Sequence, residues 1–135
     1  MRVLVDTSAL LALSLPRDQW HAAAIRTARS ISTSGHRSVG TTLVLAEFQA
    51  RLLYARGPGD ARDSVARLLA DPAHEWLPVD QDLMQHAVAR WLVRFPDQRF
   101  SLTDAVSFEV MRHERVTHAF AFDKHFETAG FKLLD

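Results

Sequence analysis

The sequence predicts an α/β protein with a central, mostly parallel sheet of about five strands and helices on both faces. Apolar, β-branched segments alternate with segments of helical periodicity along the whole chain. The first apolar segment, RVLV, lacks the polar alternation of a half-exposed strand and reads as one buried on both faces. With 135 residues, no linker and no internal repeat, the chain is predicted to form a single domain over residues 1–135.

Local signals bound the predicted elements in order. A strand at residues 2–5 leads into a short helix that ends near Pro16, because the residue before proline disfavours helical backbone. Asp18 is placed to cap the helix at 18–32. Further strands are predicted at 37–41, 75–79, 116–122 and 131–134, further helices at 43–56 (capped by Thr41 or Thr42), 61–70, 81–95 and 101–114, and a turn at 57–60.

Composition excludes several classes of function. The absence of cysteine rules out disulfides, thiolate metal sites and a cysteine nucleophile. No segment approaches the roughly 20 apolar residues of a membrane-spanning helix, and the N-terminus shows no signal peptide, so we expect no membrane association and a cytoplasmic location. The formal net charge of +0 argues against indiscriminate nucleic-acid binding, unless acidic residues gather in one pocket and leave a positive surface elsewhere.

Three aspartates stand at the predicted ends of strands and the start of a helix. Asp6 directly follows the first strand, Asp123 follows the strand HAFAF, and Asp104 lies in the first turn of the helix SLTDAVSFEVM. In open parallel sheets, ligands bind at the carboxyl ends of the strands, which places Asp6 and Asp123 at one edge. Helix capping and the helix dipole offer an alternative explanation for each aspartate taken singly.

Glu47 is the fourth candidate, on an apolar helical stripe shared with Leu43 and Ala50. It either faces the other acids or forms a surface ion pair with Arg51 at i+4. If the four carboxylates converge, two like charges about 4 Å apart repel by roughly 4 kcal/mol at an effective dielectric of about 20. Such a cluster needs a cation, and oxygen ligands favour Mg²⁺ or Mn²⁺, the ions of metal-assisted phosphodiester hydrolysis.

Four segments resemble, in order and spacing, the acidic motifs of the PIN-domain nucleases, particularly the VapC-like toxins of bacterial toxin–antitoxin systems. They are VLVDTSALLAL, TTLVLAEFQARL, FSLTDAVSFEVM and AFAFDKHFETAGFKLL, and together they cover nearly the full chain. The resemblance implies a PIN-like three-layer α/β/α fold. It also implies a Mg²⁺- or Mn²⁺-dependent ribonuclease acting on RNA, a homodimer, and inhibition by a small VapB-like antitoxin that blocks the active site.

The same resemblance assigns roles to individual residues. Asp6, Asp104 and Asp123 match the family's metal-binding acids, and Glu47 matches the helix glutamate that acts on the metal through water. Thr7 and Thr103 match its supporting hydroxyls. From the sequence, His125 and Lys124 are interpreted as surface or capping residues, with contact to substrate phosphate as the alternative for His125. Trp20, Trp76 and Trp91 are interpreted as core or dimer-face aromatics rather than base-stacking platforms.

Two other functions remain open from the residues alone. A haloacid-dehalogenase-type phosphatase also opens with a strand and an aspartate, but needs a second aspartate where this chain has Ser8. A receiver-like module would bind Mg²⁺ and accept a phosphoryl group, with Asp80 as the candidate acceptor. Neither alternative accounts for Glu47 on its apolar helical stripe.

Overall fold

The computed structural model describes residues 1–134 and confirms the predicted α/β architecture. Five strands form one sheet in the order β3-β2-β1-β4-β5, and all neighbouring pairs are parallel. Residue 135, the end of the predicted domain, lies outside the described residues. The strands are β1 (Arg2–Val5), β2 (Arg37–Thr41), β3 (His74–Leu77), β4 (His118–Phe120) and β5 (Lys132–Leu133).

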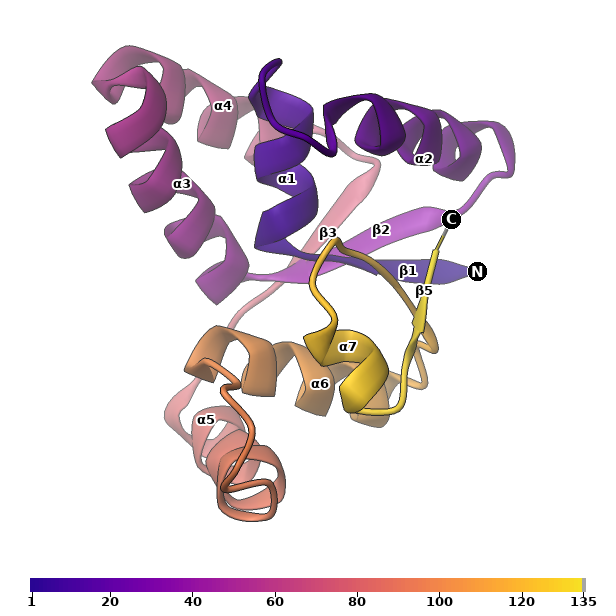
Figure 1. Cartoon of the computed structure of the whole chain (residues 1–135), viewed down its shortest axis with the longest axis vertical. Helices are drawn as coiled ribbons and strands as arrows, with labels where there is room; N and C mark the ends of the chain where they lie inside the picture. Colours follow the sequence, from indigo (N-terminus) through magenta and orange to yellow (C-terminus); the bar gives the residue numbers. More distant parts are fainter. Residues whose placement is uncertain (135) are drawn as a thin grey trace.

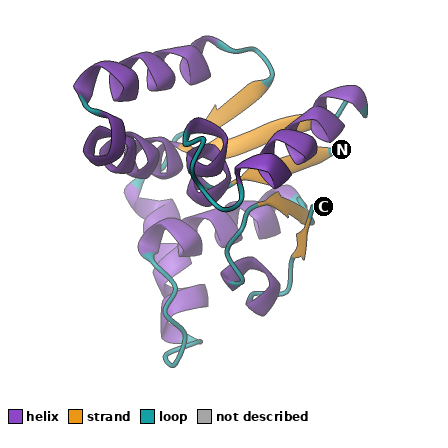
Figure 2. Cartoon of the chain, turned by 45° about the horizontal axis from the view of Figure 1, so that its top comes forward, coloured by secondary structure: helices purple, strands orange, loops and turns teal. Residues whose placement is uncertain are grey.

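Helices cover both faces of the sheet (Figures 1 and 2). Helices α1 to α4 pack on one face, and α5 to α7 with the π-helical segment η1 pack on the other. No helix among residues 1–134 is long and apolar enough to cross a membrane. The helical segments are α1 (Thr7–Ser14), α2 (His21–Thr33), α3 (Thr42–Arg56), α4 (Pro58–Ala70), α5 (Gln81–Ala87), η1 (Val88–Val93), α6 (Leu102–Glu114) and α7 (His125–Thr128).

Strand β1 supplies side chains to two separate cores. Val3 and Val5 pack with α1 to α4, whereas Leu4 packs with η1, α6 and α7 on the opposite face. This division follows from the alternation of side chains along a strand. It explains why RVLV is apolar without interruption.

Some element boundaries differ from the prediction. Helix α2 begins at His21, because Asp18 accepts a hydrogen bond from the Trp20 amide in a turn before the helix. The predicted turn at 57–60 reduces to Gly57, which adopts a φ of 91°, and Pro58 already opens α4. The helix predicted at 81–95 divides into α5 and η1.

The strand order creates a switch point beside β1. The chain leaves β1 for β2 and β3 on one side and returns to β4 and β5 on the other. Val5 pairs with Phe120, so the carboxyl ends of β1 and β4 lie side by side. The crevice beyond such a switch point is where open α/β sheets bind ligands. Asp6 and Asp123 follow those two strands.

Candidate active site

Asp6 is held at the end of β1 by groups on both sides of the switch point. Its amide donates to the Phe120 carbonyl oxygen at 3.0 Å. Its Oδ2 accepts from the Ser8 amide at 3.2 Å and from the Ser8 hydroxyl at 2.6 Å, which caps α1. Capping, one of the two explanations offered by the sequence, therefore occurs, and it fixes the carboxylate in place.

The environment of Asp6 opposes its ionisation. The residue is 4% exposed. Burial raises its pKa from 3.8 to about 6, assisted by the charges of Asp104 and Asp123 and opposed by the hydrogen bonds from Ser8. The two aspartates predicted to accompany Asp6 are thus near enough to act on it.

Asp104 and Asp123 are positioned by their own helix starts. Asp104 and Ser101 form a reciprocal capping box at the start of α6, with hydrogen bonds of 3.1 and 3.0 Å. Asp123 accepts from the His125 amide at 2.9 Å, immediately before α7. Asp104 is buried and Asp123 half-buried. Each carboxylate keeps oxygen-atom capacity beyond the bond that fixes it.

His125 joins these two aspartates, a role the sequence interpretation missed. Its Nδ1 lies 3.0 Å from Asp104 Oδ2 and 3.3 Å from Asp123 Oδ1. One ligand atom from each of the three residues falls within 4.8 Å of the others. The imidazole is half-buried, so the expected surface or capping role is wrong. Its position two residues after Asp123 was the available signal.

Glu47 stands apart from that group. It is half-buried on α3, and within residues 1–134 its carboxylate makes no hydrogen bond or ion pair, so the alternative pairing with Arg51 is absent. Leu43, one turn earlier on the same stripe, packs into the core that contains α6. Helix α3 also contacts α6 directly. Glu47 therefore shares the Leu43 side of α3, although Ala50 of the predicted apolar stripe is exposed, and it does not belong to the cluster of ligand atoms.

Ser8, rather than Thr7, supplies the supporting hydroxyl. Besides donating to Asp6, the Ser8 Oγ accepts from the Phe122 amide at 3.0 Å and so links the first turn of α1 to the segment after β4. The Thr7 hydroxyl is buried and has no hydrogen-bond partner within residues 1–134. Thr103 is half-buried in the first turn of α6.

The donor set fits a divalent cation. Asp104 and Asp123 present hard oxygen atoms to one small region, and Asp6 is buried beside them with its ionised form disfavoured. Within residues 1–134, His125 is the only side chain that forms an ion pair with any of the three aspartates. A bound cation would compensate the charge that burial and mutual repulsion oppose.

The sequence and structure comparisons point to one family. The sequence model of the PIN domain family matches residues 3–132. The chain belongs to the PIN-domain family. It is 35% identical over 133 residues to the 23S rRNA-specific endonuclease VapC20 of Mycobacterium tuberculosis, covering 96% of this chain and 95% of that protein.

Solved structures agree with this membership. The crystal structure of Mycobacterium tuberculosis VapC20, described as a toxin that cleaves the sarcin–ricin loop, superposes with a TM-score of 0.84 at 32% identity, covering 96% of this chain and 95% of that one. VapBC2 from Rickettsia felis, bound to a promoter DNA fragment, gives a TM-score of 0.73 at 10% identity, covering 98% and 97%. The second likeness concerns the fold alone.

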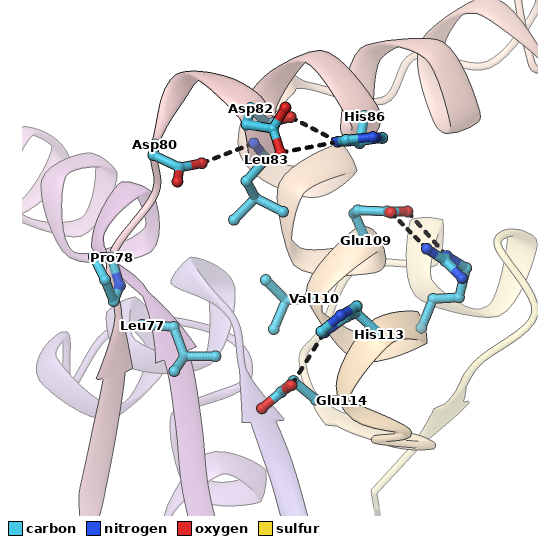
Figure 3. Close-up of a pocket in the computed structure, with 11 residues that line it drawn as sticks. Leu77, Pro78, Asp80, Asp82, Leu83, His86, Glu109, Val110, His113 and Glu114 are labelled. Carbon is cyan, nitrogen blue, oxygen red and sulfur yellow. Dashed lines mark hydrogen bonds and ion pairs between the residues drawn. The ribbon is translucent and has the colours of Figure 1, made fainter.

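A cavity lies away from the acidic cluster, beside the C-terminal half of α6 (Figure 3). This cavity of about 450 Å³ lies between α5, the end of β3 and the C-terminal half of α6. All four carboxylates that line it already have partners, so it gives no comparable reason for a cation. They are Asp80 with the Leu83 amide, Asp82 with His86, Glu109 with Arg112, and Glu114 with His113 and Arg2.

Glu109 is the buried acid of the PIN domain that the sequence interpretation did not single out. It is 3% exposed and lies within 3.0 Å of Arg90 and 2.8 Å of Arg112. Trp91 donates to it from η1 at 3.2 Å. Burial would raise its pKa, but the hydrogen bonds from Arg112 and Trp91 and the charges of both arginines lower it below the ordinary value. The Arg112 spacing was visible in the sequence, but the contact from η1 was not.

Proposed function

We propose that the protein is a metal-dependent endoribonuclease that hydrolyses RNA phosphodiester bonds, with Mg²⁺ or Mn²⁺ as its cofactor. In this proposal, Asp6, Asp104 and Asp123 hold the ion and Glu47 orients or deprotonates the attacking water. The observation that carries it is the cluster of Asp104, Asp123 and His125 beside buried Asp6 at the sheet's switch point.

Each residue contributes through a group already described. Asp104 and Asp123 direct oxygen atoms into a common space, while their helix caps keep both side chains from rotating away. Glu47 keeps its carboxylate oxygens available to accept a proton from water. A divalent cation held there would supply Lewis-acid stabilisation of negative charge on the phosphate and would acidify water.

The first candidate substrate for this protein is the one named for its relative VapC20. The chain matches 95% of that protein's length, and 23S rRNA is the substrate that its name gives. The sarcin–ricin loop is the element that the VapC20 structure names. We therefore propose this RNA loop as the first substrate to test.

The proposed biological role is the toxin of a toxin–antitoxin pair. A small VapB-like antitoxin would block the active site, and the toxin would act as a homodimer. The phosphatase and receiver-like alternatives are not favoured, because the PIN family match spans residues 3–132. Co-expression with the product of an adjacent small gene tests the pairing: growth arrest by this protein alone, relieved by that product, is expected.

The decisive experiment is cleavage of a sarcin–ricin-loop RNA and a panel of structured RNAs by the purified protein, with Mg²⁺, Mn²⁺ or EDTA. The wild-type protein should cut in a metal-dependent manner. Asp104→Asn should lower kcat/KM by roughly a thousandfold, because it removes one anionic ligand from a site whose cation contributes several kcal/mol.

A matched control separates chemistry from folding. Asp82 also lies in the first turn of a helix, but it is exposed and outside the cluster. Asp82→Asn should retain kcat/KM within about twofold. Metal-dependent cleavage that survives in Asp104→Asn would refute the proposed ligand assignment. Absence of cleavage of every RNA by folded wild-type protein would refute the ribonuclease proposal for those substrates.

A further inference from the structure

A hollow of about 440 Å³ adjoins the acidic cluster and is distinct from the cavity in Figure 3. It shares Ser8, Asp123 and His125 with the candidate active site. A molecule that fills the hollow therefore reaches Asp123, one of the residues proposed to hold the metal ion. None of the roles assigned so far uses the rest of its lining.

The hollow has an aromatic wall made of Trp20 and Phe122. Their rings stack with centroids 5.5 Å apart and an interplanar angle of 6°. Phe122 also packs edge-on against buried Phe120, which anchors the pair to the core. The Trp20 amide is held by Asp18 Oδ1 at 2.8 Å. Trp20 is 45% exposed, so of its two predicted roles, core or dimer-face aromatic, the core role is wrong and the dimer-face role stays a prediction.

Such a wall suits a flat ligand. Trp20 lines the hollow and is partly exposed, so its indole can offer a planar group a stacking surface there. Stacking on an aromatic side chain is the common way in which proteins hold an unpaired nucleobase. Burying the rest of the indole also recovers the free energy lost by its exposure.

The hollow also carries positive charge. Arg51 from α3 and Lys124 from the start of α7 line it, and within residues 1–134 neither forms an ion pair. The acids beside them are Asp18, which is engaged by the Trp20 amide, and Asp123 of the cluster. Two cations in a protein of formal net charge +0 therefore gather where a phosphate backbone would approach the acidic site.

We propose that this hollow binds an unpaired nucleotide of the RNA next to the scissile phosphate. The base stacks on Trp20, and Arg51 and Lys124 contact the adjoining phosphate. The inference rests on the proposed ribonuclease function and adds a substrate requirement to it. A base in an A-form helix is stacked between its neighbours, so it is not available to Trp20. The protein should therefore select loops or single strands.

The test uses the full-length protein, a short single-stranded RNA and its perfect duplex. Binding is measured by fluorescence anisotropy on the cleavage-deficient Asp104→Asn background, and cleavage on the otherwise wild-type chain. Trp20→Ala should weaken single-strand binding and raise KM about tenfold, within the range seen when a stacking aromatic is removed. Trp20→Phe should restore most of that loss, since phenylalanine still offers a ring face.

Two controls show whether the effect is specific. Tyr54 is an aromatic residue of α3 that is 94% exposed and does not line the hollow, so Tyr54→Ala should change neither binding nor KM. Arg51→Gln should reduce the slope of log K against log salt by about 0.7, the value for one phosphate contact with a single strand.

The outcomes distinguish this proposal from the one on which it rests. Unchanged binding and KM in Trp20→Ala would overturn the nucleotide subsite and leave the hollow to another occupant, such as a protein partner. Equal, Trp20-dependent binding of single strand and duplex would overturn the requirement for an unpaired base. Trp20-dependent binding by a wild-type protein that cuts no RNA would support the subsite while refuting the ribonuclease function.

Discussion

Helix α6 places two buried acids, one in its first turn and one near its middle, in opposite electrostatic settings. At the N-terminal end, Asp104 joins Asp6 and Asp123 with His125 as the one nearby imidazole. Five residues further along, Glu109 lies between two guanidinium groups and an indole N–H. The pKa of Asp6 is raised to about 6, whereas that of Glu109 is lowered.

This contrast teaches that burial alone does not identify a functional acid. Asp6 and Glu109 are almost equally buried, at 4% and 3% exposed. Arg90 and Arg112 neutralise the charge of Glu109, so the negative charge at this part of α6 is already compensated within the protein. Asp6 and its neighbours remain under-compensated, which is the condition in which an acidic cluster gains from a cation.

The largest expected loss of folding stability comes from breaking the ion pairs of Glu109 with Arg90 and Arg112. Glu109→Gln should lower the free energy of unfolding by about 2 kcal/mol, because it leaves the partly exposed Arg90 and Arg112 without their anion. Urea denaturation at neutral pH measures the change. Asp63→Asn, which breaks an exposed pair with Arg62, should cost less than about 0.5 kcal/mol.

The sequence predicted the sheet because its strands carry their own signature. RVLV has no polar alternation, and the predicted strands at 2–5, 37–41 and 75–79 each end near a helix start. The positions of Asp6 and Asp123 then followed from the rule that parallel strands present their carboxyl ends at one edge. Boundaries were less accurate where a single residue decides them, as at Pro78, whose missing N–H ends β3 early.

The unpredicted parts depend on distances between remote segments. His125 reaches Asp104 from 21 positions away, and only the packing of α7 on α6 reveals that contact. Ser8 and Thr7 are adjacent hydroxyl residues, and the geometry of the α1 cap decides which one faces Asp6. Arg90 meets Glu109 from η1, a break in helical regularity that the sequence pattern did not signal.

A second prediction concerns Asp6, where a substitution removes the cost of burying a charge that the protein does not compensate. Asp6→Asn should raise the free energy of unfolding of the metal-free protein by about 1–3 kcal/mol at neutral pH, since asparagine can still accept from Ser8 and has no charge to desolvate. The same change should abolish metal-dependent cleavage. Stability would then increase as activity is lost, whereas Glu109→Gln should lower stability.

The raised pKa of Asp6 determines how folding stability should change with pH. In the folded protein the pKa of Asp6 is raised from 3.8 to about 6, so the folded state binds the proton more tightly. The contribution of Asp6 to stability is therefore full below about pH 4 and is lost as the pH rises through about 6. Denaturation in EDTA across this window should show that loss in wild-type protein and its disappearance in Asp6→Asn. An unchanged pH profile would contradict the assignment.

The smallest expected effect concerns the Ser8 hydroxyl, which contacts both Asp6 and the Phe122 amide. Ser8→Ala removes a donor to Asp6 and an acceptor for the Phe122 amide, so the free energy of unfolding should fall by about 1–2 kcal/mol. Because the hydrogen bond from the Ser8 hydroxyl lowers the pKa of Asp6, its loss should also move the pH transition upward, while the backbone amide of residue 8 still donates. Thr7→Val, which removes a buried hydroxyl without a partner in residues 1–134, should be neutral or stabilising. If Thr7→Val instead shifted the transition and Ser8→Ala did not, the supporting hydroxyl would be Thr7, as the family resemblance alone implies.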